Sequence, residues 1–112
     1  YVYNNSLTTV KITGTSDVSG GIVIPATFTG TGSTSLTVTE LGETTFYNNA
    51  DITSVNIPTS VTFIGTTAFN GTTALTTIYI TDGQLINGST VTSNTIVTDP
   101  YGHTGDVRFS SL

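Results

Sequence analysis

The chain has 112 residues, of which nine are charged, and its formal net charge is −5. This length fits one domain. Two basic residues cannot form the cation cluster that binds phosphate groups, so we expect neither nucleic acid nor a membrane surface as a partner. The lack of cysteine excludes disulfides, thiolate zinc sites and cysteine nucleophiles. No apolar run approaches the roughly 20 residues of a membrane span, which argues against membrane insertion.

Threonine dominates the composition, with 27 copies beside 11 serines. Threonine, valine and isoleucine branch at Cβ and favour extended backbone, and no segment keeps the 3.6-residue apolar period of a helix. We therefore expect a mainly β protein. Short alternating runs predict strands at residues 10–12, 22–24, 51–57, 75–80 and 95–98.

A repeat of 23 residues occupies the middle of the chain, where residues 41–63 align over residues 64–86 without a gap. The matching positions are apolar or turn positions, whereas the residues between them differ. Stacked coils produce this pattern, because each coil buries the same positions against its neighbours. The main aligned pairs are Leu41/Ile64, Gly42/Gly65, Phe46/Phe69, Ile52/Leu75, Thr53/Thr76, Val55/Ile78 and Ile57/Ile80.

Each repeat holds a strand of the form L-x-x-L-x-L, which is typical of leucine-rich repeats. Together with the Ile-Gly start and the Ala-Phe pair of the second unit, residues 41–80 resemble the BspA-type leucine-rich repeat, and the resemblance extends over about residues 10–82. It implies a short right-handed leucine-rich-repeat solenoid. Residues 98–110, TDPYGHTGDVRFS, faintly resemble a module of bacteriophage tail fibres.

We divide this single domain into three parts. Residues 1–25 form the N-terminal strands or cap, residues 26–82 the leucine-rich-repeat coils, and residues 83–112 an irregular C-terminal cap or tail. The runs Val10–Ile12 and Ile22–Ile24 are too close for another coil and predict a capping β-hairpin that turns through residues 16–21. The expected core is Ile22, Ile24, Val38, Leu41, Phe46, Ile52, Val55, Ile57, Val61, Ile64, Phe69, Leu75, Ile78 and Ile80, with Phe46 stacked on Phe69.

Few residues suit catalysis or metal binding. His103 is the only histidine and is interpreted as an exposed loop residue. Glu40 and Glu43 flank Gly42 and are interpreted as solvated turn residues, and the glycines of residues 29–33 lack the pattern of a nucleotide-binding loop. We therefore expect no enzymatic activity, no cofactor and no metal site, while weak calcium binding by the C-terminal part stays open.

The candidate contact residues lie on the strand face. In L-x-x-L-x-L the intervening side chains point outward, which selects Ser54 and Asn56 in one coil and Thr77 and Tyr79 in the next. Val23 and Lys11 would extend this row. An exposed tyrosine among small polar residues supplies contact area at a low entropic cost.

The resemblance implies a surface or secreted protein that serves adhesion. The main hypothesis is a non-enzymatic extracellular recognition or adhesion module whose hydroxyl-rich β-face binds a protein or glycan. The alternative is a structural subunit of an extracellular assembly, such as a virion fibre, a decoration protein or a surface filament, in which copies of the chain bind each other. A recognition module should hold residues 1–9 and 83–112 on its own body, whereas an assembly subunit donates them to a neighbour.

Overall fold

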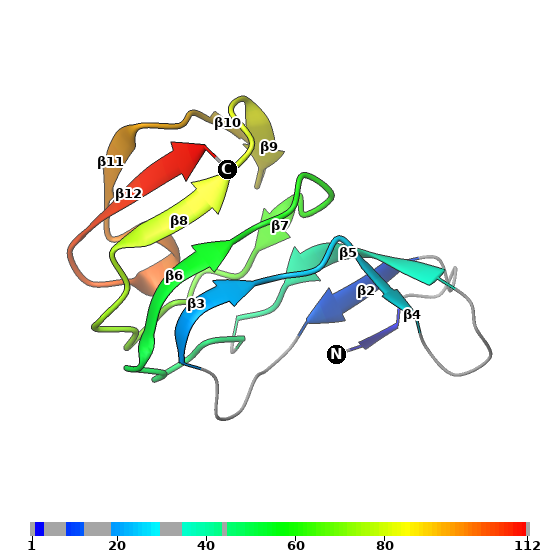
Figure 1. Ribbon diagram of the computed structural model, residues 1–112, viewed down its shortest axis with the longest axis horizontal. Coiled ribbons are helices and arrows are strands. Elements are labelled where there is room, and N and C mark those ends of the chain that lie inside the picture. The colour runs from blue at the N-terminus through cyan, green and yellow to red at the C-terminus, as the bar shows by residue number, and fades with distance from the viewer. Residues whose placement is uncertain (1, 4–8, 13–18, 30–34, 44, 112) are drawn as a thin grey trace.

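The computed structural model describes residues 2–3, 9–12, 19–29, 35–43 and 45–111. A five-stranded sheet, called the main sheet below, runs along one side of the molecule in the order β11-β12-β8-β6-β3 (Figure 1). Neighbouring strands are parallel from β3 to β12, and only the pair β11–β12 is antiparallel. The strands are β3 (Gly20–Val23), β6 (Ile52–Asn56), β8 (Thr77–Ile80), β11 (Thr95–Thr98) and β12 (Asp106–Ser111).

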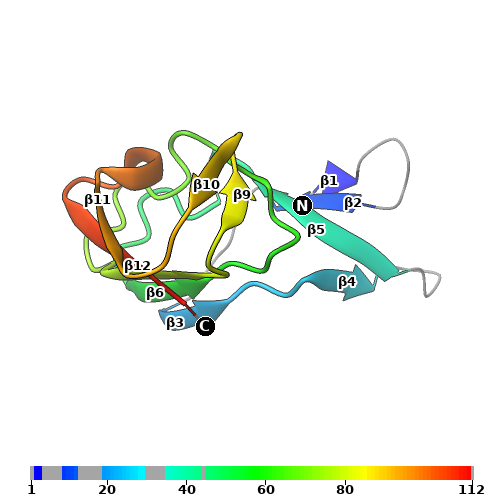
Figure 2. The ribbon, with the colours of Figure 1, turned by 90° about the horizontal axis from the view of Figure 1, so that it is seen from above.

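The remaining described strands form a second sheet and a separate hairpin. Figure 2 shows the main sheet along the lower side and the β9–β10 hairpin above it. A second sheet has the order β1-β2-β5-β4, and β7 pairs with β5. The strands of the second sheet are β1 (Val2–Tyr3), β2 (Thr9–Ile12), β4 (Thr27–Thr29), β5 (Ser35–Leu41) and β7 (Phe63–Ile64). The separate hairpin consists of β9 (Gln84–Ile86) and β10 (Ser89–Val91).

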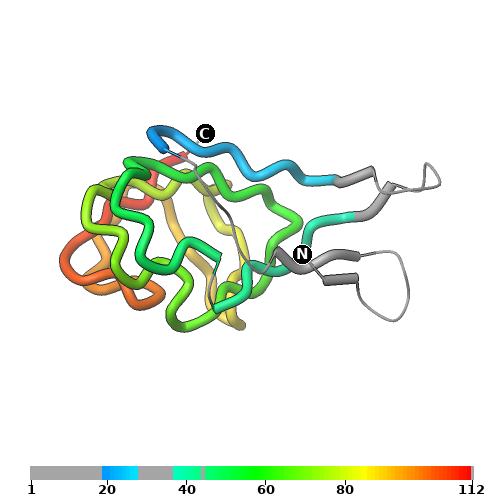
Figure 3. Tube along the Cα trace, turned by 90° about the horizontal axis from the view of Figure 1, so that it is seen from below, coloured from blue at the N-terminus to red at the C-terminus, as the bar shows by residue number. Residues whose placement is uncertain are grey.

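The predicted 23-residue coils stack directly on one another, as the path of the chain in Figure 3 shows. Val55 lies opposite Ile78 in the register of β6 and β8. Between the strands, the amide of Gly65 donates to the carbonyl of Leu41 at 2.8 Å, and the amide of Thr76 donates to the carbonyl of Thr53 at 3.0 Å. Each coil therefore satisfies backbone groups of the coil before it, and the expected leucine-rich-repeat solenoid is confirmed.

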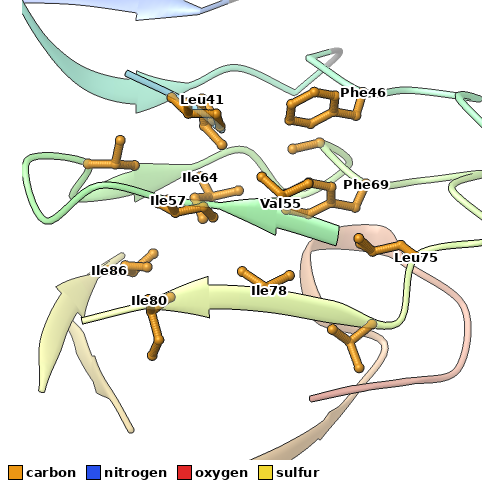
Figure 4. Close-up of a cluster of buried hydrophobic side chains, with 14 of the residues drawn as sticks. Leu41, Phe46, Val55, Ile57, Ile64, Phe69, Leu75, Ile78, Ile80 and Ile86 are labelled. Atoms are coloured by element: carbon orange, nitrogen blue, oxygen red, sulfur yellow. The ribbon is translucent and has the colours of Figure 1, made fainter. Parts of the chain in front are cut away.

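The core lies inside this stack and matches the expected set closely (Figure 4). All the expected residues are buried except Ile22, which is partly buried against the cluster. The rings of Phe46 and Phe69 stack with centroids 5.4 Å apart and planes 5° from parallel. The sequence pattern missed two buried residues within the second repeat, Ala68 and Ile86, and two beyond it, Val107 and Phe109.

Gly65, at the start of the second coil, allows this close stacking. A Cβ atom on Gly65 would lie 2.5 Å from the backbone nitrogen of Glu43 in the preceding coil, which is too short for any real contact. Gly65 therefore cannot carry a side chain without moving the two coils apart. This explains why glycine stands at position 65.

The repeat continues past the point where its apolar pattern is lost. Gln84 stands where Val61 stands one coil earlier, and it is buried. Its amide nitrogen donates to the carbonyls of Pro58 at 2.7 Å and Val61 at 3.0 Å, which replaces apolar contact with hydrogen bonds. Asn87 accepts from the amide of Ile64 and donates to its carbonyl, both at 2.9 Å.

The C-terminal segment is not irregular, so this expectation is wrong. Strand β12 pairs in parallel with β8 and supplies the strand of a third coil. The ring centroid of Tyr101 lies 6.1 Å from that of Phe69, so Tyr101 takes the position of the repeated phenylalanine. Tyr101 follows Phe69 by 32 residues, nine more than one repeat, and the β9–β10 hairpin lies in this longer stretch. Residues 98–110, which resemble a tail-fibre module, thus contain the 3₁₀ helix η1 (Pro100–Gly102) and most of β12.

The expected N-terminal hairpin is also wrong. Strand β2 pairs in parallel with β5, and β3 pairs in parallel with β6, so the two runs lie in different sheets. Of the turn expected at residues 16–21, residues 16–18 lie outside the described residues, and Gly20 and Gly21 are part of β3. A short distance along the sequence suggested a hairpin, but the apolar run of β3 instead adds a rung to the main sheet (Figure 1).

Removal of the central ring should test the stacked core. Phe69 lies between Phe46 and Tyr101, so Phe69→Ala should lower the free energy of unfolding by about 3–5 kcal/mol. The change is measured by chemical denaturation. Phe63→Ala is the matched control, because Phe63 is 43% exposed. Equal stability of the two variants would show that Phe69 does not contribute to the core.

Alkaline pH should destabilise the third coil through Tyr101. Burial raises the pKa of Tyr101 from 10.0 to about 12. The unfolded chain therefore loses this proton before the folded chain does, and the stability that the neutral phenol contributes is lost as the pH rises from 10 to about 12.

We expect the melting temperature of the wild type to fall more steeply across this window than that of Tyr101→Phe, which has no ionisable group at this position. Thermal melts followed by circular dichroism measure both slopes. Parallel slopes would contradict the assignment of the alkaline loss to Tyr101.

Candidate functional site

The four predicted contact residues lie together on the outer face of the main sheet. Ser54 is in register with Thr77, and Asn56 is in register with Tyr79, on the adjacent strands β6 and β8. All four side chains are partly exposed, whereas the apolar residues that alternate with them, Val55, Ile57, Ile78 and Ile80, are buried in the core. The period of two in each strand separates the two faces in this way.

The register extends this face to both sides of the four residues. On one side, Gly21 and Val23 of β3 lie opposite Ser54 and Asn56. On the other side, Arg108 and Ser110 of β12 lie opposite Thr77 and Tyr79, and Ile96 of β11 lies opposite Arg108. We call this surface the outer face; it comprises Gly21, Val23, Ser54, Asn56, Thr77, Tyr79, Ile96, Arg108 and Ser110.

Only part of the outer face was predictable from the sequence pattern. Val23 extends the row as expected, whereas Lys11 does not, because β2 belongs to the second sheet. Arg108 and Ser110 were missed because the third coil was missed. The alternation of residues 106–110, in which Val107 and Phe109 are apolar, was the signal that could have placed them.

The outer face combines hydroxyl and amide groups with a few larger side chains. Tyr79 lies near its centre, between Asn56 and Ser110. Val23 at one edge is 70% exposed and Ile96 at the other edge is 59% exposed. Arg108 is the single cationic side chain on this surface. Such a surface can donate and accept hydrogen bonds over a broad area and offers apolar contact at its edges.

His103 is buried, so its interpretation as an exposed loop residue is wrong. Only 4% of its surface is exposed, and its Nδ1 atom lies 3.2 Å from the carbonyl oxygen of Gly105. Its Nε2 atom has no hydrogen-bond partner in the described part of the chain. A small cavity of about 30 Å³ lies beside it, which is room for about one or two water molecules.

The other residues considered for catalysis do not converge on one site. Glu40 is part of β5 and not of a turn, while Glu43 is exposed just after that strand. Asp99 accepts a hydrogen bond from the amide of Gly105, and Asp106 accepts one from the hydroxyl of Thr98 at 2.9 Å. Residues 30–33 of the glycine-containing run lie outside the described residues.

The described residues contain neither a metal-binding cluster nor a membrane-spanning helix. No group of three or more histidine, aspartate or glutamate side chains is placed to hold a metal ion. No helix in this part of the chain is long and apolar enough to cross a membrane.

Stacked coils with one parallel strand each, and a ring at the same position of each coil, define a leucine-rich-repeat protein. A family model described as "BspA type Leucine rich repeat region (6 copies)" matches residues 24–98. The chain therefore belongs to the BspA-type leucine-rich-repeat family, as the resemblance implied.

Among solved structures, the chain is similar to a leucine-rich cell surface protein from Faecalibacterium prausnitzii A2-165. The TM-score is 0.63 and the sequence identity is 30%. The match covers 79% of this chain but only 22% of that protein, so the chain spans less than a quarter of its relative. No curated protein matches the chain.

Proposed function

We propose that the chain is a non-enzymatic extracellular recognition module that binds a protein on a surface through its outer face. The observation that carries this proposal is the register of the five strands, which joins hydroxyl, amide and phenol groups from separate coils into one surface. Membership of the BspA-type family and the similarity to a leucine-rich cell surface protein support an extracellular or cell-surface location.

Tyr79 is the proposed anchor of this contact. It lies in register with Asn56 on one side and Ser110 on the other, so a ligand over Tyr79 also meets an amide and a hydroxyl group. Aromatic side chains contribute much of the binding energy of protein interfaces, and small polar neighbours around them exclude water. Ser54 and Thr77, two residues earlier in the same strands, supply further hydrogen-bonding groups to the same ligand.

The arrangement of the C-terminal segment supports recognition over a role as a structural subunit that donates its ends. Residues of β11 and β12 pair within the main sheet of their own chain. Strand β1 likewise pairs with β2 of the same chain. A virion fibre, a decoration protein or a filament built from this chain would therefore use its outer edges and not an exchanged tail.

Alanine at Tyr79 should test the proposed anchor. The purified chain is applied to an array of purified cell-surface and extracellular proteins, and every protein it binds is titrated. We expect Tyr79→Ala to weaken such binding by at least about tenfold, because truncation of a central aromatic residue removes about 2 kcal/mol or more.

Tyr47→Ala is the matched control, because Tyr47 is 51% exposed and lies outside the main sheet. Its binding should equal that of the wild type. Equal binding by all three proteins would show that the outer face is not the contact surface, and equal loss in both variants would lead to the same conclusion.

A further inference from the structure

The main sheet ends in two open edges that match each other. No described strand pairs with the outer edge of β3 or with the outer edge of β11. Free backbone donors and acceptors at a sheet edge are a template for another strand. The two edges belong to opposite ends of the same sheet (Figure 1).

Hydrogen bonds within the sheet show which residues face the edge at β3. The amides of Gly20 and Ile24 donate toward β6, to Asp51 and Asn56, both at 3.0 Å. Because backbone groups alternate sides along a strand, those of Gly21 and Val23 point away from β6 toward the open edge. Both residues are exposed, and Val23 belongs to the outer face.

At the opposite end of the sheet, the hydrogen bonds of β12 fix which residues of β11 face the open edge. The amide of Arg108 in β12 donates to the carbonyl of Thr76 at 3.0 Å. The backbone groups of Arg108 therefore point toward β8 and away from β11. Val107 and Phe109 therefore bond to Val97 and Thr95, which are their register partners in β11. The backbone groups of the alternate residues Ile96 and Thr98 consequently point to the open edge, and both side chains are exposed.

The two edges are complementary in direction, register and side-chain chemistry. An antiparallel pair that sets Val23 of one copy opposite Ile96 of another also sets Gly21 opposite Thr98. Every residue in this pair directs its backbone groups toward the partner strand, so two hydrogen-bonded pairs form. Val23 and Ile96, exposed by 70% and 59%, then contact each other on one face of a continuous sheet.

We propose that the chain associates head to tail with a second copy of itself, through antiparallel pairing of β3 in one copy with β11 in the next. This inference goes beyond the recognition role and does not depend on it. Because the two edges differ, each copy keeps a free edge after pairing, and the contact propagates without closing into a two-fold dimer. Two short strands bury little area, so the association is weak and needs a high local concentration.

Sedimentation velocity on the wild-type chain, from about 10 µM to about 1 mM, measures the association. We expect the weight-average mass to rise with concentration and to pass the mass of a dimer without a plateau. A monomer at every concentration would overturn the proposal. A plateau at the dimer would also overturn it, because it indicates a two-fold contact that uses one edge twice.

Charge variants at the two edges give the sharper test. Val23→Lys and Ile96→Glu each remove one partner of the apolar contact, and each alone should weaken association by at least about tenfold. An equimolar mixture of the two variants should regain association, because it restores one unmodified edge pair and adds an opposite-charge pair.

Leu85→Lys is the matched control, because Leu85 is 53% exposed in β9 and lies off the main sheet. It should associate as the wild type does. Equal weakening by Leu85→Lys, or no recovery in the mixture, would contradict pairing between these two edges.

Discussion

The backbone hydrogen bonds between successive coils are the constraint on which the rest of this structure depends. One coil of 23 residues is too small to bury its own apolar side chains, so it is stable only against a neighbour. Gly65 lets the second coil approach the first closely, because a side chain there would collide with the backbone of Glu43. Once the coils stack, Phe46, Phe69 and Tyr101 meet in one column, and the outward residues of separate strands join into one surface.

The packing of the core determines which residues form the outer face. The apolar positions of each strand are fixed by packing, and the intervening positions must then point outward. The outer face is therefore as regular as the core beneath it, although its residues vary from coil to coil. Substitutions at these outward positions can change the ligand that a repeat protein binds with little loss of stability, which fits the proposed recognition role. The same regularity leaves an open strand edge at each end of the main sheet, which natural sheets must either cover or use.

The sequence predicted the parts of the fold that repeat and failed at the parts that interrupt the repeat. The 23-residue period identified the two central coils, the stacking of Phe46 on Phe69 and the register of Asn56 with Tyr79. The third coil escaped detection because the β9–β10 hairpin adds nine residues before Tyr101, so no fixed period reaches it. Buried polar residues such as Gln84 hid the pattern further, because their hydrogen bonds form only in the folded chain. The N-terminal strands were misassigned because two apolar runs so close in the sequence favour a hairpin. In the structure, β3 instead pairs with β6, the strand of the coil formed by residues 41–63.

Native-state hydrogen exchange measured by NMR tests the account most directly, because it reports the bonds between coils one at a time. The amide of Thr76 bonds to the coil before it, and the amide of Arg108 bonds to the strand of the second coil. The amide of Phe69 donates to the carbonyl of Tyr101 in the third coil. If three coils form one cooperative stack, all three amides exchange slowly and with similar free energies of opening. Rapid exchange at Arg108 beside a protected Thr76 would contradict the account, since the third coil would then not be part of the stack.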